Sequence, residues 1–226
     1  GCRGIAAKPF DESCIWPRQL RYLVRADRPE VDGKEAEIER LRYWRPLLVK
    51  NGRRIKTTAE DYGPDIMCDF LIDFMVRHKN DPFFIYYPML LPHGESGAKH
   101  SGEPSGTTPP TPDPLNPGKR RAAGINGMKE YIDVLVGRII GALDKNALRE
   151  DTIVIFTSDN GSYGRRGKGK AYEAGVWVPL VVNCPGRVKA LRQVHELASF
   201  VDILPTMCEL SGAPVPEGID GISFAP

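Results

Sequence analysis

An α/β fold with a mostly parallel sheet sandwiched by helices is predicted by the alternation of two apolar patterns. Apolar residues recur at helical spacing over 66–75 and 131–143. Short apolar runs over 81–90, 152–158 and 178–183 are typical of strands. Strands that are apolar on both sides occur in parallel sheets whose two faces are covered by helices. In such sheets ligands bind beyond the carboxyl ends of the strands.

Residues 1–60 are irregular and charged, and we expect them to lie at the periphery of the sheet. Asn51 and Gly52 favour a two-residue type I′ turn, which predicts a hairpin. The α/β domain is expected to occupy residues 61–226. Within it, residues 94–127 are rich in Pro, Gly, Ser and Thr, and so long a loop in a compact domain is usually functional or disordered.

The C-terminal part of the chain predicts a further strand and a helix. Residues 195–201, "HELASFV", are interpreted as a further strand. Asp202 is placed to cap the N-terminus of a helix that runs to Leu210, and Gly212 follows the end of that helix.

Composition argues against several classes of protein. The 226 residues are enough for one α/β domain or two small ones. The 31 basic and 29 acidic residues leave a net charge of +2, which argues against a nucleic-acid footprint. No transmembrane span is expected, because no long uninterrupted apolar run is present. The five cysteines include no Cys-x-x-Cys pair, which argues against a zinc framework.

Asp159 and Asn160 come directly after the strand predicted at 152–158. Their side chains offer oxygen ligands to a hard cation, and Ca²⁺ takes roughly six to eight such ligands. Two adjacent residues at a strand end can point both side chains at one ion. The alternative is that Asp-Asn-Gly is simply a turn.

Lys168 and Lys170 are flanked by glycines in the loop that follows. Glycine lets backbone N–H groups approach an anion closely, and a lysine adds a positive charge there. The alternative is a solvated basic loop, since Arg165 and Arg166 are its neighbours. The loop is not a Walker A motif, because the spacing differs and no Ser or Thr follows the lysine.

His93 follows the strand predicted at 81–90, in the sequence Leu91-Pro92-His93. A histidine at a strand end can bind an anion or protonate a leaving oxygen, and the alternative is an ordinary surface histidine. Together with the cation pair and Lys168, it describes a site for an oxyanion ester. Sulfate and phosphate both fit such a site.

These motifs together resemble the sulfatase family. The stretch "TSDNGSYGRRGKGKAYEAGVWVPLVVNCPG" is similar to its Asp-Asn-Gly turn, Gly-Lys-Gly loop, Tyr-Glu-x-Gly motif and Val-Pro strand. "FFIYYPMLLPH" resembles the family strand that ends in Pro-His, "ASFVDILPTMCELSGAP" its Asp-x-x-Pro-Thr helix and "DGISFAP" its Asp-Gly-x-Ser segment. "FDESCIW" resembles sulfatases of the arylsulfatase A type. The resemblance covers residues 60–226 and implies an alkaline-phosphatase-like α/β fold.

The resemblance implies hydrolysis of sulfate esters. Asp159 and Asn160 would be Ca²⁺ ligands. Lys168 would contact the sulfate and the bridging oxygen, and His93 would help to protonate the leaving group. The family's nucleophile is a formylglycine made from Cys or Ser in a Cys-x-Pro-Ser-Arg motif. Substrates would be small sulfate esters or sulfated glycans, and relatives are commonly periplasmic, secreted or lysosomal.

Parts of the family pattern are missing from this sequence. The stretch Cys14-Ile15-Trp16-Pro17-Arg18 carries its Pro one place late and lacks the Ser. No Asp-Asp pair occurs, although the family's metal site uses one. Trp177 stands where relatives frequently have Arg. We therefore expect an incomplete sulfatase domain, truncated in its first third and its C-terminal subdomain, which is inactive alone and binds Ca²⁺ weakly or not at all.

Two other functions fit part of the pattern. A phosphodiesterase or phosphonate hydrolase of the alkaline phosphatase superfamily would share the sheet. Such enzymes often hold two transition metals with several Asp and His ligands, and this chain has four histidines. A non-catalytic anion-binding remnant would explain the missing nucleophile.

Overall fold

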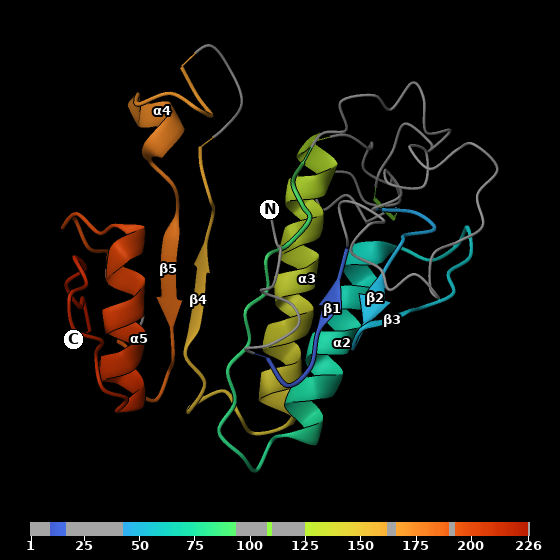
Figure 1. Cartoon of the computed structure of the whole chain (residues 1–226), viewed down its shortest axis with the longest axis horizontal. Coiled ribbons are helices and arrows are strands. Elements are labelled where there is room, and N and C mark those ends of the chain that lie inside the picture. The colour runs from blue at the N-terminus through green and yellow to red at the C-terminus, as the bar shows by residue number, and fades with distance from the viewer. Residues whose placement is uncertain are drawn as a thin grey trace. The chain divides into compact units, whose positions relative to one another are not determined.

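The chain forms two compact units, residues 1–146 and residues 147–226 (Figure 1). Helices and strands occur in both units, in agreement with the α/β class that the sequence predicts. None of the described helices has the length and apolar character of a membrane span. The structure is a computed structural model that describes residues 10–16, 43–93, 108–109, 125–161, 166–189 and 193–225.

The first unit contains two long helices, α2 (Gly63–Arg77) and α3 (Ile125–Lys145). Pro64 lies in the first turn of α2, where backbone N–H groups have no partner within the helix, so its missing N–H costs no hydrogen bond. Each helix buries one stripe of apolar side chains, so the two helices predicted from apolar spacing are confirmed. The buried apolar residues are Met67, Cys68, Leu71 and Met75 of α2, and Met128, Tyr131, Leu135 and Leu143 of α3.

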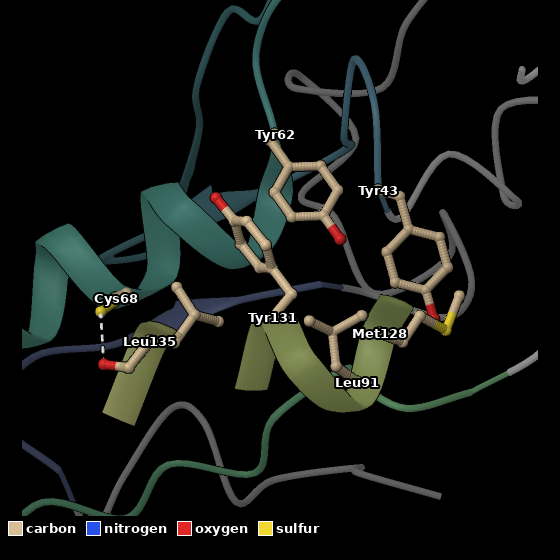
Figure 2. Packing of buried hydrophobic residues seen from close by; sticks show 7 residues of the cluster. All are labelled: Tyr43, Tyr62, Cys68, Leu91, Met128, Tyr131 and Leu135. Carbon is tan, nitrogen blue, oxygen red and sulfur yellow. Dashed lines mark hydrogen bonds between the residues drawn. The ribbon is translucent and has the colours of Figure 1, made fainter. Parts of the chain in front are cut away.

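Three tyrosines form the centre of the core of the first unit. Figure 2 shows Tyr62 between Tyr131 of α3 and Tyr43, which precedes the hairpin. The Tyr62 and Tyr131 rings meet edge to face with their centres 5.3 Å apart, and the Tyr43 ring stacks on Tyr62 at 6.3 Å. Such aromatic pairs add about 0.5–1.5 kcal/mol to the burial of their area. Tyr43 lies in the segment that the sequence predicts to be peripheral, and its place in the core was not foreseen.

Asp65 of α2 forms a half-buried polar group with α3. Tyr131 Oη donates to the Asp65 carboxylate at 2.9 Å, and Arg138 Nη1 donates to it at 2.8 Å. Arg138 also pairs with Asp69. Burial raises the pKa of Asp65, and the Tyr131 hydrogen bond and the Arg138 charge oppose that shift. The two helices are therefore joined by polar as well as apolar contacts.

A small antiparallel sheet lies beside these helices. It consists of β1 (Cys14–Ile15), β2 (Val49–Lys50) and β3 (Arg53–Arg54). Asn51 and Gly52 connect β2 to β3 with φ angles of 48° and 79°. A type I′ turn requires positive φ at both central residues, so the predicted hairpin is confirmed.

The strand predicted at 81–90 is not formed. Residues 82–93 have no regular structure and run along α3 in Figure 1. Phe84 and Tyr86 are 57% and 64% exposed, whereas Leu91 is buried in the core. A strand forms only where a neighbour satisfies its backbone hydrogen bonds, and no described strand pairs with this segment.

The second unit contains the two strands predicted before and after the glycine-rich loop. They are β4 (Val154–Thr157) and β5 (Leu180–Asn183), and they pair antiparallel with Thr157 opposite Leu180. All strand pairs among the described residues are antiparallel, so the expected mostly parallel arrangement is not found there. Parallel neighbours need a long crossover, usually a full helix. The connection here contains only the four-residue helix α4 (Glu173–Val176) in its described part, and the chain turns back.

The helix predicted after Asp202 is confirmed as α5 (Ile203–Ser211), and Gly212 ends it with a φ of 73°. The strand predicted at 195–201 is not formed, and its last residues begin the 3-10 helix η3 (Phe200–Asp202). The Asp202 carboxylate makes no capping bond to α5. It accepts hydrogen bonds from the backbone N–H groups of Ser199 at 2.7 Å and Ile222 at 2.8 Å.

Backbone N–H groups of the segment 220–224 form hydrogen bonds to the side chains of Asp202 and Thr206. The buried Thr206 hydroxyl donates to the Asp202 carbonyl at 2.6 Å and accepts the Phe224 N–H at 3.0 Å. A Cβ on Gly221 would lie 1.9 Å from the Val201 carbonyl oxygen. The Asp-x-x-Pro-Thr and Asp-Gly-x-Ser patterns therefore meet in one structural contact.

Two expectations concern regions that the structure does not describe fully. Most of the loop predicted at 94–127 lies outside the described residues, apart from 108–109 and the first residues of α3. The division of the chain into a peripheral segment, 1–60, and a sulfatase-type domain, 61–226, stays a prediction.

Candidate functional site

Asp159 and Asn160 follow β4 directly and lie side by side at the start of the loop. Asn160 Nδ2 donates to Asp159 Oδ1 at 2.6 Å. Ser158 Oγ donates to the Asn160 carbonyl at 3.1 Å and tightens the turn. Asp159 is exposed and Asn160 is half-buried. The structure thus brings the two predicted metal ligands within contact of each other at a strand end.

Lys168 lies in a second turn, residues 167–170, which we call the lysine turn. The Lys170 N–H donates to the Gly167 carbonyl at 3.0 Å, and Gly169 has a φ of 78°. A positive φ at the third residue of a turn is the mark of type II, and glycine adopts it without strain. The turn leaves Lys168 and Lys170 exposed.

Gly175 of α4 joins the two turns. The Gly161 N–H, next to Asn160, donates to the Gly175 carbonyl at 2.9 Å. A Cβ on Gly175 would lie 2.4 Å from the Lys170 carbonyl oxygen and 2.6 Å from that of Gly167. A Cβ on Gly161 would lie 2.1 Å from the Ala174 carbonyl oxygen. Backbone contacts that only glycine permits therefore bring the Asp159–Asn160 pair and the lysine turn against the same helix.

The charge around the lysine turn is positive. Arg166, Lys168 and Lys170 are exposed, and no ion pair joins them to a carboxylate among the described residues. The Arg166 guanidinium lies 5.6 Å from the centre of the Tyr172 ring, which is a cation–π distance. An anion at this loop would be attracted by uncompensated cations.

His93 belongs to the first unit, and the other three predicted site residues belong to the second. The Tyr43 hydroxyl donates to the His93 carbonyl at 2.6 Å, so the backbone at His93 is tied to the core. The imidazole is exposed. The convergence of His93 with Asp159, Asn160 and Lys168 stays a prediction. No sequence signal pointed to Tyr43 as a support for His93.

The metal-ligand set is small in the described part of the chain. No cluster of three or more His, Cys, Asp or Glu side chains that could hold a metal occurs there. Asp159 and Asn160 have the oxygen chemistry that Ca²⁺ prefers, but two side chains supply few of its roughly six to eight ligands. They fit part of a calcium site and do not form a complete one.

Cys14, the nearest sequence match to the family's nucleophile, has a structural place. It lies in β1 opposite Lys50 of β2. Burial raises the pKa of its thiol to about 11, although the nearby Lys50 charge opposes the shift. A thiol of this pKa is protonated at neutral pH, which is the inert form.

The chain is therefore an α/β protein in which one short helix, α4, contacts both a carboxylate–amide pair and a lysine turn. The family model that matches this chain is described as Sulfatase, and it covers residues 19–213. The chain therefore belongs to the sulfatase family.

Known relatives agree with this assignment. Arylsulfatase A of Homo sapiens is 33% identical over 183 residues, which are 73% of this chain and 31% of that protein. An N-acetylgalactosamine-6-O-sulfatase of Bacteroides thetaiotaomicron is 30% identical over 174 residues, 68% of this chain and 31% of that protein. The crystal structure of Ps i-CgsB in complex with k-i-k-neocarrahexaose matches 80% of this chain and 41% of that chain, with a TM-score of 0.62 and 28% identity. The chain thus spans about a third of the length of these curated relatives.

Proposed function

We propose that this protein takes part in the hydrolysis of sulfate esters. The observation that carries the proposal is the contact at Gly175, which holds the Asp159–Asn160 turn and the lysine turn against one helix. Family membership indicates the reaction class. The contact at Gly175 places the Asp159–Asn160 pair and Lys168, which we assign to the site, against the same helix. The residues of that contact fall within 19–213, the range that the family model covers.

The residues are assigned complementary roles. The Lys168 ammonium binds the sulfate and stabilises negative charge that develops on its oxygens. Asp159 and Asn160 would supply two of the oxygen ligands of a Ca²⁺ ion, and such an ion would polarise the sulfate. His93 donates a proton to the leaving oxygen. The formylglycine nucleophile has no matching motif in these 226 residues, so this chain alone is expected to bind sulfate without turnover.

The substrate is proposed to be a small sulfate ester or a sulfated glycan. Relatives named for arylsulfates and for N-acetylgalactosamine 6-sulfate both match this chain. The exposed side chains of Lys168 and Lys170 are compatible with either kind of ligand.

Lys168→Ala tests the anion role. The substitution is expected to weaken the binding of sodium sulfate and of an aryl sulfate roughly tenfold or more, because a charge-assisted contact is lost. Chemical shifts of the Gly167 and Gly169 amides measure the binding. Lys189→Ala is the matched control, since Lys189 is an exposed lysine of the same unit outside the loop. Equal binding by Lys168→Ala and the unaltered chain would remove Lys168 from the site.

Calorimetry tests the metal role. We expect Ca²⁺ binding weaker than micromolar for this chain, because two side chains cannot replace most of the ion's water shell. The residual binding should disappear in Asp159→Asn. Micromolar binding by the unaltered chain would contradict the partial site.

A further inference from the structure

Arg166 and Lys170 have no role in the proposed reaction, yet they flank Lys168 in a fixed geometry. The three cationic residues occupy alternate positions over 166–170. The type II turn fixes the backbone between Gly167 and Lys170. Cα atoms two residues apart are separated by roughly 5–7 Å, so three positive groups start from points at about that spacing.

These cations differ in their partners from two arginines of the first unit, Arg77 and Arg138. Arg77 pairs with Glu12 at 2.7 Å and with Asp73 at 3.0 Å, and Arg138 pairs with Asp65 at 2.8 Å. In the described part of the second unit, no carboxylate forms an ion pair with Arg166, Lys168 or Lys170. Like charges at this spacing repel each other, and that repulsion is relieved when anions bind between them.

The surrounding contacts keep the outer two cations in place. The Tyr172 ring supports the Arg166 guanidinium at 5.6 Å, and the ring is itself more than half exposed. The Lys170 carbonyl lies against Gly175, where a Cβ would come within 2.4 Å. Tyr172, the residue before α4, therefore contacts the Arg166 guanidinium, and Gly175 of α4 fixes the backbone at Lys170.

We propose that Arg166 and Lys170 form a second anion subsite beside Lys168. The substrate then carries, besides the sulfate that Lys168 binds, a further sulfate or carboxylate roughly 5–10 Å away, a distance set by the residue spacing and the length of the side chains. Neighbouring rings of a multiply sulfated or uronate-containing glycan carry anionic groups at such distances. A singly charged aryl sulfate does not. The inference rests on the proposed function and specifies its substrate class.

The test compares three probes on the full chain by calorimetry: a monosulfated monosaccharide, a disulfated disaccharide, and a disaccharide with one sulfate and one uronate carboxylate. We expect the two doubly charged probes to bind roughly tenfold more tightly than the monosulfate at low salt. The preference should shrink as salt is added, because screening weakens the second contact. Comparison of the two doubly charged probes shows whether sulfate or carboxylate is the preferred second group.

The variant Arg166→Gln/Lys170→Gln is expected to lose the preference and to keep the affinity for the monosulfate. Arg187→Gln/Lys189→Gln is the matched control, because it removes one arginine and one lysine from exposed positions of the same unit. This control should keep the preference. Far-UV circular dichroism establishes that both variants are folded.

Four results would overturn the inference. The unaltered chain could bind all three probes equally, or the Arg166/Lys170 variant could keep the preference. The same variant could lose monosulfate binding as strongly as disulfate binding, which would place both residues in a single anion site. Equal losses in the control variant would mean general charge attraction. Absence of binding to every sulfate probe would instead contradict the proposed function itself, so the two failures are distinguishable.

Discussion

Side chains from α2 and α3 fill a core in the first unit, whereas the loops of the second unit are fixed by contacts between backbone atoms. Leu135, Tyr43 and Cys68 are fully buried in the first unit. In the second, the described residues classed as buried are Gly167, Gly175, Cys184, Pro205 and Thr206. Many of its large apolar side chains are exposed, among them Val176, Trp177, Val181, Leu197, Phe200, Val201 and Ile222.

The difference shows where each unit is sensitive to substitution. Burial of apolar area stabilises the first unit, so the volume of its side chains matters. In the second unit, Gly161, Gly175 and Gly221 each leave space that a neighbouring carbonyl oxygen occupies. The family motif that contains Asp-Asn-Gly and Tyr-Glu-x-Gly therefore has a steric reason for its glycines, separate from any chemistry of the side chains beside them.

Leu135→Ala gives the largest expected effect and tests the role of the first core. It should lower the free energy of unfolding of the first unit by about 2–5 kcal/mol, because a buried leucine is replaced by a cavity. Hydrogen exchange of amides in α2 and α3 measures the loss. If amides of β4 and β5 lost protection to the same extent, the two units would not be separate in stability.

Gly161→Ala should come next and act on the second unit. The added Cβ would meet the Ala174 carbonyl oxygen, which costs about 1–3 kcal/mol and separates the Asp159–Asn160 turn from α4. Sulfate binding and amide protection of Gly161 and Gly175 are the measurements.

Gly137→Ala is the matched control in α3, where a Cβ would meet no atom within 4 Å. There the same substitution should stabilise the first unit by about 1 kcal/mol, since alanine favours a helix. If the two glycine substitutions change the free energy of unfolding in opposite directions, the contrast between the units is supported. Changes in the same direction would remove it.

The smallest expected effect concerns Asp202 and pH. Hydrogen bonds from the Ile222 and Ser199 N–H groups lower the pKa of this carboxyl in the folded chain. The charged form is therefore favoured by folding, and its contribution is present above the ordinary aspartate pKa of about 3.9 and lost as pH falls through the lower folded value. In acid, the free energy of unfolding should depend less on pH in Asp202→Asn than in the control variant Glu217→Gln. Identical profiles would mean that the two hydrogen bonds do not stabilise the fold.

Local signals in the sequence predict the elements that depend on neighbouring residues. The stripe that includes Tyr131 and Leu135 predicts α3, the pair Asn51-Gly52 predicts the hairpin, and Gly212 predicts the end of α5. The side-by-side position of Asp159 and Asn160 also follows from their place after a strand. Each of these features is decided by periodicity or backbone conformation within a few residues.

Features that depend on distant partners were not predicted. The run at 81–90 has the composition of a strand, but pairing decides whether a strand forms, and composition does not report the partner. The direction of β5 against β4 depends on how the 22 residues between them turn, as the bounds of the two strands show. The sequence indicated Gly161 and Gly175 only as members of the Asp-Asn-Gly and Tyr-Glu-x-Gly motifs, and their contact was not foreseen. A long-range steric contact leaves no periodic signal in a single sequence.

The irregular segment 83–87 has a consequence for handling this chain in solution. Residues 83–87 make no backbone hydrogen bond to another described residue, and no charged side chain lies between Pro82 and Pro92. Such a row of open peptide groups next to exposed aromatic rings is a template for cross-β association. Association of the chain should therefore depend more strongly on protein concentration than on temperature. Light scattering that falls when the sample is diluted would show that the association is reversible.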